Sequence, residues 1–506
     1  MADWPALLSR DLATQGAALA LADASGELSR ADLDNRVRLW SAFLARKNLL
    51  PGDRVLLLLP HGVDSWVAML AALALGTTVI PVSPGLPGAE IRHLVRTWRP
   101  AACLVTEAGP EIGLDPEQVI SLESLPRKWP RQRNPGSLGS DAVLRFATRG
   151  QVLLPGGPLP GEAGCLHGIE AILANARRLV STLALAPGLA GLLALPVGHW
   201  AGLVLGLGLL DAGRTIWLVD PDGSLPAPED GGLFACFTTL AHWRRGLARP
   251  DPPGAGPAIR HLVAMAGIVS RELLRQTRCR IGAAPVDLVY GTPMHLAATR
   301  LRIEAEVPAP GCIGHPLPGA GLRIMRRPMQ AARPGQAGYL VHAGDGGIAC
   351  RPGREGPLSP AGETPFDQQE IGWQDEEGRL FRLPSPKDLI RTAGHVLAPE
   401  ALEQQILDSG LVEDAFAFGV PHPDLQEAVV LVVVARPRVT PHQLRQFCRE
   451  TLPDFMVPHR IELHARLPAL SLARSGRHYL RLRYAGFYGE VPTSYPGSAL
   501  RGPACR

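Results

Sequence analysis

The stretch LPSPKDLIRTAGHVLAPEALE, residues 383–403, decides how this chain is divided. Prolines stand on both sides of Ser385 and interrupt regular structure. We therefore expect one folded unit to end near residue 383 and a second unit to begin at residue 384. Within the second unit, Pro399 suits the first position of a helix, and the sequence predicts a helix over residues 399–407.

The residues that follow predict a small α/β domain. Apolar runs at 415–420 and 428–434 indicate two strands, and the spacing of apolar residues over 441–451 indicates a second helix. We place this domain at residues 384–491. The remaining segment, residues 492–506, is predicted to be a flexible tail.

Residues 1–383 predict one large α/β domain. Apolar strands alternate with helices in its first part, which is typical of parallel sheets covered by helices on both faces. Glycine-rich alternating runs over 325–382 predict β-hairpins, a β-rich subdomain that closes the large domain. The expected strands are 55–59, 78–82, 102–106, 192–195, 216–219, 261–265 and 286–289, and the expected helices are 63–75, 89–97 and 169–176.

Composition excludes several classes of protein. Hydrophobic residues make up 46% of the 506 residues, enough for a large core, and the net charge of +4 is too small to indicate nucleic-acid binding. The eight cysteines form no CxxC pair, so neither a zinc site nor a disulfide framework is predicted. Prolines and glycines interrupt the apolar residues 179–210, which argues against a membrane span, and the N-terminus has no signal pattern. We expect a cytoplasmic protein.

Four further segments show a resemblance to a known family. Together with residues 383–403, they resemble the superfamily of AMP-forming acyl-CoA synthetases and adenylation domains, also called adenylate-forming ligases. The likeness runs in order along nearly the whole chain. The segments are PGDRVLLLLPHGVDSWVAMLAALALGTTVIPVSP (51–84), LPVGHWAGLVLGLGLLDAGRTIWLV (195–219), GVPHPDLQEAVVLVVV (419–434) and LRQFCRETLPDFMVPHRIELHARLP (444–468).

The resemblance implies two half-reactions. In the first, ATP with Mg²⁺ and a small carboxylic acid give an acyl- or aryl-adenylate and pyrophosphate. In the second, the small domain rotates as a mobile lid, and a thiol takes the acyl group. The thiol is that of CoA or of phosphopantetheine on an acyl carrier protein. No nucleic-acid partner is implied.

The triphosphate requires a loop rich in N–H and hydroxyl donors. The corresponding segment here is residues 154–164, in which Gly156 and Gly157 are the candidate phosphate contacts. Three prolines in this segment lack N–H donors, no hydroxyl is present, and Glu162 is an anion where a cation is expected. The alternative is a structural Gly/Pro loop with no ligand.

A second motif, Tyr290-Gly291-Thr292-Pro293-Met294, corresponds to the part of the family that contacts the adenine and the α-phosphate. Tyr290 is the candidate for stacking on adenine. Pro293 stands where the family has a threonine, and Met294 replaces its metal-binding glutamate. Because a thioether is a poor ligand for Mg²⁺, we predict no metal ligand in this motif. A strand end that fills the core is the alternative.

The resemblance assigns ribose binding to an aspartate and an arginine, whose places are taken by Glu370 and Ser385. Glu370 keeps the carboxylate on a longer side chain, whereas Ser385 cannot make the bidentate contact of an arginine. Lys387 falls on the hinge position, and Asp388 follows it as in the family.

Arg477 takes the place of a C-terminal catalytic lysine that bridges the carboxylate and the α-phosphate. Arginine keeps the positive charge, but its planar guanidinium is not equivalent to a compact ammonium group. His199 and Trp200 correspond to residues that line the acyl pocket. The alternatives are a solvated Arg477 on a basic segment and a structural histidine at a strand-to-helix turn.

Two functions follow from these residues, and both remain open. The first is a ligase that makes an acyl-adenylate and transfers the acyl group to a thiol, with reduced activity because motif residues are replaced. The second is a catalytically inactive paralogue that serves as a binding or scaffold module for a carrier protein or a partner synthetase. A third reading, acyl transfer without adenylation, has no nucleophile to support it.

Overall fold

The structure is a computed structural model. Apart from some short gaps inside elements, it describes the two main folded parts of the chain and leaves the N-terminal segment, several connections and the C-terminal tail undescribed. The described residues are 15–84, 86, 88–106, 112–125, 150–154, 165–220, 232–248, 258–265, 269–293, 296–304, 306, 309, 311–327, 330–342, 370–384, 388–465, 467, 477, 480–481 and 483–484.

The first sheet has six strands in the order β6-β5-β3-β4-β7-β8. All of its pairs are parallel except β7 with β8. The central strands are almost fully buried, as expected for continuous apolar runs covered on both faces. The strands are β3 (Arg54–Leu58), β4 (Thr78–Val82), β5 (Ala102–Val105), β6 (Val119–Ser121), β7 (Gln151–Leu154) and β8 (Cys165–Gly168), with helices α3 (Arg30–Arg46), α4 (Val63–Ala74) and α5 (Gly88–Trp98) and two short 3₁₀ turns, η1 (Pro116–Gln118) and η2 (Leu122–Ser124).

The second sheet follows a path of fourteen strands among the described residues, β17-β16-β18-β19-β20-β15-β14-β13-β12-β11-β9-β10-β1-β2. Its parallel half comprises β1 (Leu19–Asp23), β9 (Ala190–Leu193), β10 (Ile216–Leu218), β11 (Leu233–Thr239), β12 (Ala258–Met265) and β13 (Val286–Thr292), and β2 (Gly26–Ser29) adds an antiparallel edge. The other half is antiparallel: β14 (Leu296–Ile303), β15 (Cys312–Pro316), β16 (Leu322–Arg327), β17 (Gln330–Ala331), β18 (Gly338–His342), β19 (Ile371–Gln374) and β20 (Leu380–Leu383).

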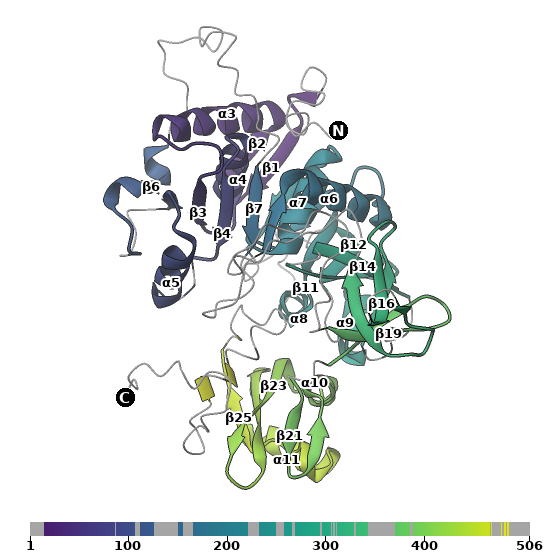
Figure 1. Ribbon diagram of the computed structural model, residues 1–506. Coiled ribbons are helices and arrows are strands. Elements are labelled where there is room, and N and C mark those ends of the chain that lie inside the picture. The colour runs from purple at the N-terminus through teal and green to yellow at the C-terminus, as the bar shows by residue number, and fades with distance from the viewer. Residues whose placement is uncertain are drawn as a thin grey trace.

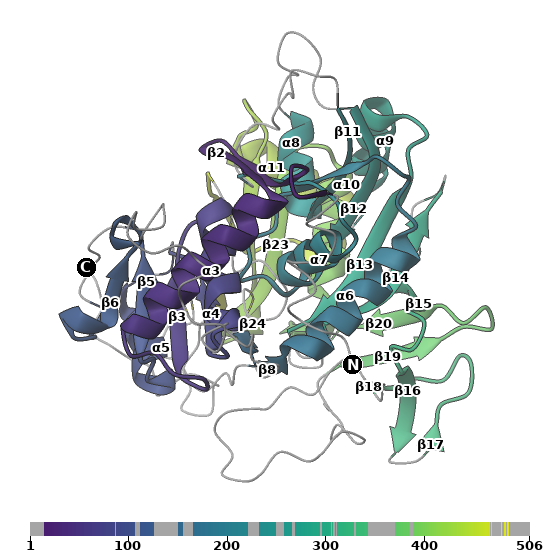
Figure 2. The ribbon, with the colours of Figure 1, turned by 90° about the horizontal axis from the view of Figure 1, so that it is seen from above.

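Helix α7 (Trp200–Asp211) occupies the core of the large domain, and eleven of its twelve residues are buried. Such an all-round apolar helix is stable only when other elements surround it. It packs against α6 (Ile169–Leu183) and the end of β14, and Figure 2 shows both helices between α4 and the strands β13 and β14. A Cβ atom on Gly206 would lie 2.1 Å from the ring of Trp66, so α7 and α4 are in direct contact.

The small domain contains a five-stranded sheet, β22-β21-β24-β23 with β25 beside β24. Figure 1 shows it below the large domain, with β23 and α10 nearest to the helices α8 (Leu240–Ala248) and α9 (Arg271–Ile281). Its elements are β21 (Ile390–Thr392), β22 (His395–Leu397), α10 (Pro399–Asp408), β23 (Val412–His422), β24 (Gln426–Ala435), α11 (Pro441–Thr451), the 3₁₀ turn η5 (Asp454–Met456) and β25 (Arg460–Leu463).

Polar contacts join the two domains at one end of the small sheet. Arg244 Nη1 lies 3.5 Å from Asp414 Oδ1, and both side chains are nearly buried. The Arg271 backbone N–H also donates to Asp408 Oδ1 at 3.1 Å. These contacts fix the orientation of the small domain in this structure.

The α/β fold class is confirmed, and the predicted strands and helices recur with shifts of a few residues, except that α6 extends to Leu183. The division at residue 383 stays a prediction, and the tail at 492–506 lies outside the described residues. In the part of the chain that the structure describes, no helix has the length and apolarity needed to cross a bilayer.

Candidate nucleotide site

The end of β13 brings two predicted site residues together. The Tyr290 hydroxyl donates a hydrogen bond to Glu370 Oε2 at 2.5 Å, although 80 positions separate the two residues in the chain. Glu370 directly precedes β19, and its backbone carbonyl accepts from the Leu340 N–H at 2.9 Å. A phenol ring and a carboxylate therefore lie side by side where the parallel half of the sheet meets its antiparallel half.

Gly291 allows a close approach of chains behind this pair. A Cβ atom at this position would lie 1.8 Å from the Leu296 carbonyl oxygen and 2.6 Å from the Trp200 ring. Leu296 itself has a φ of 49°, the left-handed region that bulky residues rarely adopt. Leu296 at the start of β14 is therefore held in a strained conformation, and Trp200 packs directly against Gly291.

Two side chains outside the predicted set hold the turn from β13 to β14. His167 Nε2 lies 2.6 Å from the Pro293 carbonyl oxygen, and the amide of Asn175 makes two hydrogen bonds with the Ala297 backbone, at 2.9 and 3.1 Å. His167 is 1% exposed, and burial lowers its pKa. The ring is therefore neutral and donates its Nε2 proton to Pro293. The sequence around His167 and Asn175 contains no pattern that predicts a role for either residue at this site.

His199 caps α7 rather than offering a charge to a ligand. Its Nδ1 accepts from the Ala201 backbone N–H at 3.1 Å, so the neutral ring carries its proton on Nε2. Burial, together with nearby His242, lowers the pKa of His199 to about 3. At neutral pH the ring is uncharged, and it can line an apolar pocket beside Trp200 but cannot form an ion pair with a carboxylate.

Arg477 lies inside the small domain. Its Nη2 contacts both carboxylate oxygens of Glu403 at 2.7 Å, its Nη1 donates to Glu400 Oε1 at 2.6 Å, and its Nε donates to the Ala417 carbonyl at 3.3 Å. The guanidinium also stacks over the Phe416 ring at 4.9 Å. Burial alone would lower the pKa of Arg477, but the two glutamates outweigh it and raise the pKa well above its ordinary value.

The structure describes the residues on either side of the predicted hinge. Arg382, near the end of β20, lies 3.7 Å from Glu400 at the start of α10, so one carboxylate is shared by residues before and after the hinge. Asp388 is nearly buried and adds its charge to the field that acts on Arg477. The predicted residues Gly156, Gly157, Ser385 and Lys387 lie outside the described residues, as does Met294, and their roles stay predictions.

The residues present do not form a protein cage for a metal ion. Among the described residues, no group of three or more His, Cys, Asp or Glu side chains is placed to hold a metal ion. Glu370 is an oxygen donor at the site, but it is hydrogen-bonded to Tyr290.

A buried ion network lies behind the site strand. Asp287 on β13 is fully buried and accepts from His261 Nε2 at 2.6 Å, from Arg300 Nε at 2.8 Å and from Arg302 Nε at 2.8 Å. Burial would raise the pKa of Asp287, but these donors outweigh it and lower the pKa to about 2. Arg300 also donates to the Thr182 carbonyl at 2.6 Å, which ties the sheet to the end of α6.

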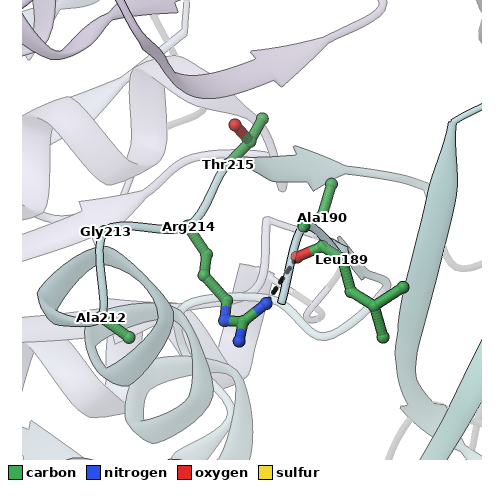
Figure 3. A pocket seen from close by; sticks show the side chains of 7 residues that line it. Leu189, Ala190, Ala212, Gly213, Arg214 and Thr215 are labelled. Carbon is green, nitrogen blue, oxygen red and sulfur yellow. Dashed lines mark hydrogen bonds between the residues drawn. The ribbon is translucent and has the colours of Figure 1, made fainter. Parts of the chain in front are cut away.

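A separate hollow of about 330 Å³ lies between the α6–β9 connection and the α7–β10 turn (Figure 3). Its most prominent side chain is Arg214, whose guanidinium donates to the carbonyls of Leu185, Ala186 and Leu189 at 2.9–3.0 Å. Because these bonds occupy both terminal nitrogens, Arg214 holds the connection together, and the hollow has no convergent set of groups for a ligand.

The geometry defines a class of protein: a large domain with two sheets, a smaller C-terminal domain, and an aromatic–carboxylate pair at a strand end. Comparisons with known proteins agree. Residues 8–140 match the model of the AMP-binding enzyme family, and residues 401–477 match that of the AMP-binding enzyme C-terminal domain.

Relatives resemble the chain over most of its length. The long-chain-fatty-acid–CoA ligase of Salmonella typhimurium is 23% identical, with 89% of each chain covered. The sulfoacetate–CoA ligase of Cupriavidus necator is 25% identical, with 92% of each chain covered. The crystal structure of ATP-bound MatB from Rhodopseudomonas palustris has a TM-score of 0.72 at 20% identity and covers 96% of this chain and 99% of its own. The two matched segments carry the AMP-binding enzyme domains, and the chain as a whole resembles CoA ligases in sequence and shares the fold of MatB.

Proposed function

We propose that this protein is an AMP-forming acid–thiol ligase. It would activate a carboxylic acid with ATP as an acyl- or aryl-adenylate and transfer the acyl group to the thiol of CoA. Relatives named as CoA ligases over nearly the full length of the chain support this reaction class.

The observation that carries the proposal is the contact between Tyr290 and Glu370. In this proposal, the Tyr290 ring stacks on adenine, and Glu370 accepts from the ribose hydroxyls. The hydrogen bond between them holds both side chains in place before the nucleotide arrives, which reduces the entropy lost on binding. His167 and Asn175 support the same arrangement from behind by fixing the β13–β14 turn.

Calorimetric titration of the purified protein with ATP and Mg²⁺ tests the proposal. We expect saturable binding in the range of about 1 μM to 1 mM that is typical for enzyme substrates. Tyr290→Ala should weaken binding by roughly tenfold or more, because stacking of a base on an aromatic ring contributes about 1–3 kcal/mol. Glu370→Gln should also weaken it.

The matched control is Glu377→Gln, because Glu377 lies on the same β19–β20 hairpin but is exposed. It should leave ATP affinity unchanged. Binding would then justify a screen of carboxylic acids for pyrophosphate release. If no heat of binding is detected at about millimolar nucleotide, a range that includes typical substrate affinities, the ligase proposal is wrong.

One observation favours a second candidate, an inactive paralogue that binds a carrier protein or a partner synthetase. Arg477, the residue in the place of the catalytic lysine, is bound on all sides within the small domain. Under this candidate, ATP binding and pyrophosphate release would both be absent. The protein would instead associate with phosphopantetheinylated carrier protein, which a pull-down with a purified carrier measures directly.

A further inference from the structure

The guanidinium of Arg477 uses all three of its nitrogens within the small domain. Nη2 donates to both carboxylate oxygens of Glu403, Nη1 donates to Glu400 Oε1, and Nε donates to the Ala417 carbonyl oxygen. The Phe416 ring covers one face of the guanidinium. A guanidinium can direct three nitrogens at three separate partners and stack on a ring with its flat face, whereas an ammonium group has neither the spread of donors nor the flat face.

The burial of the two partners makes this contact hard to break. Arg477 is 7% exposed and Glu403 is 3% exposed. Glu403 is also hydrogen-bonded to strand β23, because its Oε1 accepts from the Ala417 N–H at 2.8 Å. If Arg477 left, Glu403 would stay behind as an unpaired buried carboxylate, and an uncompensated buried charge is strongly unfavourable.

Glu400 is more exposed than Glu403 and has a second cation nearby. Its side chain is 25% exposed, and Arg382 lies 3.7 Å away as a second partner. After Arg477 departs, Glu400 would therefore keep Arg382 as a cationic partner. The restraint on Arg477 comes from Glu403.

We propose that Glu403 holds Arg477 as a structural cation of the small domain and thereby restrains formation of the acyl-adenylate. The slower formation of the acyl-adenylate rests on the proposed function, whereas the pairing of Glu403 with Arg477 does not. Breaking a buried ion pair disfavours the released state by a factor on the order of 10²–10³. In the second half-reaction the thiol attacks the acyl carbon of a preformed adenylate and AMP leaves, which does not require Arg477 at the α-phosphate, so the restraint acts on adenylate formation alone.

The kinetic test measures the two half-reactions separately in the full-length protein. Glu403→Gln removes the buried charge and keeps the shape of the side chain, so pyrophosphate release should rise at least about tenfold, while thioester formation from synthetic acyl-adenylate should not change. Glu400→Gln is the matched control and should alter neither rate by more than about twofold. A folded Glu403→Gln protein whose pyrophosphate release is unchanged or lower overturns the proposal.

A stability cycle tests the pairing without any activity and covers the case in which Glu403→Gln fails to fold. The variants are Arg477→Met, Glu403→Met and the double variant. Each single change should lower the unfolding midpoint, whereas the double change should recover most of the loss, because neither charge is left alone. Additive losses overturn the proposal. If no variant binds ATP, the proposed function fails, and the cycle still decides the role of Arg477.

Discussion

Asp287→Asn is the substitution with the clearest expected effect on stability. Asp287 lies on β13, three residues before Tyr290, and it is the common acceptor for His261, Arg300 and Arg302. Asparagine has nearly the same shape, but it carries no charge and replaces one acceptor oxygen with a donor. The substitution therefore removes the charge from the network without creating a cavity.

The size of the effect follows from the pKa of Asp287. The pKa of Asp287 falls from its ordinary value of 3.8 to about 2 in the folded protein, because the hydrogen bonds from His261, Arg302 and Arg300 outweigh the effect of burial. By linkage, ionised Asp287 stabilises the folded state at neutral pH by about 2 kcal/mol relative to a neutral side chain. Removing one partner of a buried pair has cost about 3–5 kcal/mol elsewhere. Arg300 and Arg302 reach solvent and can be rehydrated when Asp287 loses its charge. We therefore expect the free energy of unfolding to fall by about 2 kcal/mol rather than by about 3–5 kcal/mol.

The sign of the pH dependence is fixed by the direction of the shift. A lowered folded-state pKa gives stability that is fully present above the unfolded value of 3.8 and disappears as pH falls through about 2. The difference between the wild type and Asp287→Asn should therefore be constant above about pH 5 and should shrink to roughly half at about pH 3.

Urea unfolding followed by tryptophan fluorescence, at neutral pH and at lower pH, measures this difference through the transition midpoint. Thermal unfolding should show a decrease of about 2–4 °C for a domain of this size. Glu272→Gln is the control, because Glu272 pairs with Arg275 on an exposed helix face, where a salt bridge contributes about 0–1 kcal/mol. If Asp287→Asn costs no more than the control, or if its cost persists at low pH, the reasoning is wrong.

Three further outcomes are expected. His167→Leu should lower ATP affinity by roughly five- to tenfold through loss of one hydrogen bond to the turn, whereas His167→Gln should retain most of the affinity; equal effects would contradict this role. Gly291→Ala should abolish ATP binding and lower stability by about 1–3 kcal/mol, because its Cβ would meet the Leu296 carbonyl; unchanged calorimetry would refute it. Arg244→Met should accelerate limited proteolysis between the domains several-fold, because it leaves Asp414 unpaired; unaltered cleavage would show that other contacts orient the small domain.

Most of the strands were readable from sequence because their residues are buried on both faces. Continuous apolar runs gave β3, β4 and β5 almost to the residue. The path of the second sheet was not readable in the same way. The pairing of β15 with β20 joins residues about seventy positions apart, and no local pattern specifies which antiparallel strands become neighbours.

The site was predicted only in part. The resemblance singled out Tyr290 and Glu370, and the structure places them in contact. The network around Asp287 was missed, although a signal was present: an acid interrupts the apolar run of β13, and two arginines alternate on the strand that follows. An alternating pair of cations opposite a buried acid is a cross-strand pattern that sequence can reveal. His167 had no comparable signal, since its partner is a backbone carbonyl 126 residues away.

Arg477 shows why the type of a residue does not determine its role. Arginine outnumbers lysine 48 to 3 in this chain, so a change of lysine to arginine near the C-terminus is by itself weak evidence about function. A lysine that must move between two positions needs partners that it can leave, and its compact, strongly hydrated charge suits that need. Arg477 instead binds both oxygens of Glu403 through Nη2 and Glu400 through Nη1, and the 3% exposure of Glu403 prevents water from replacing the arginine there. Under the proposed function, an arginine at this position therefore changes the mobility of the charge more than its sign, and formation of the acyl-adenylate would depend on that mobility.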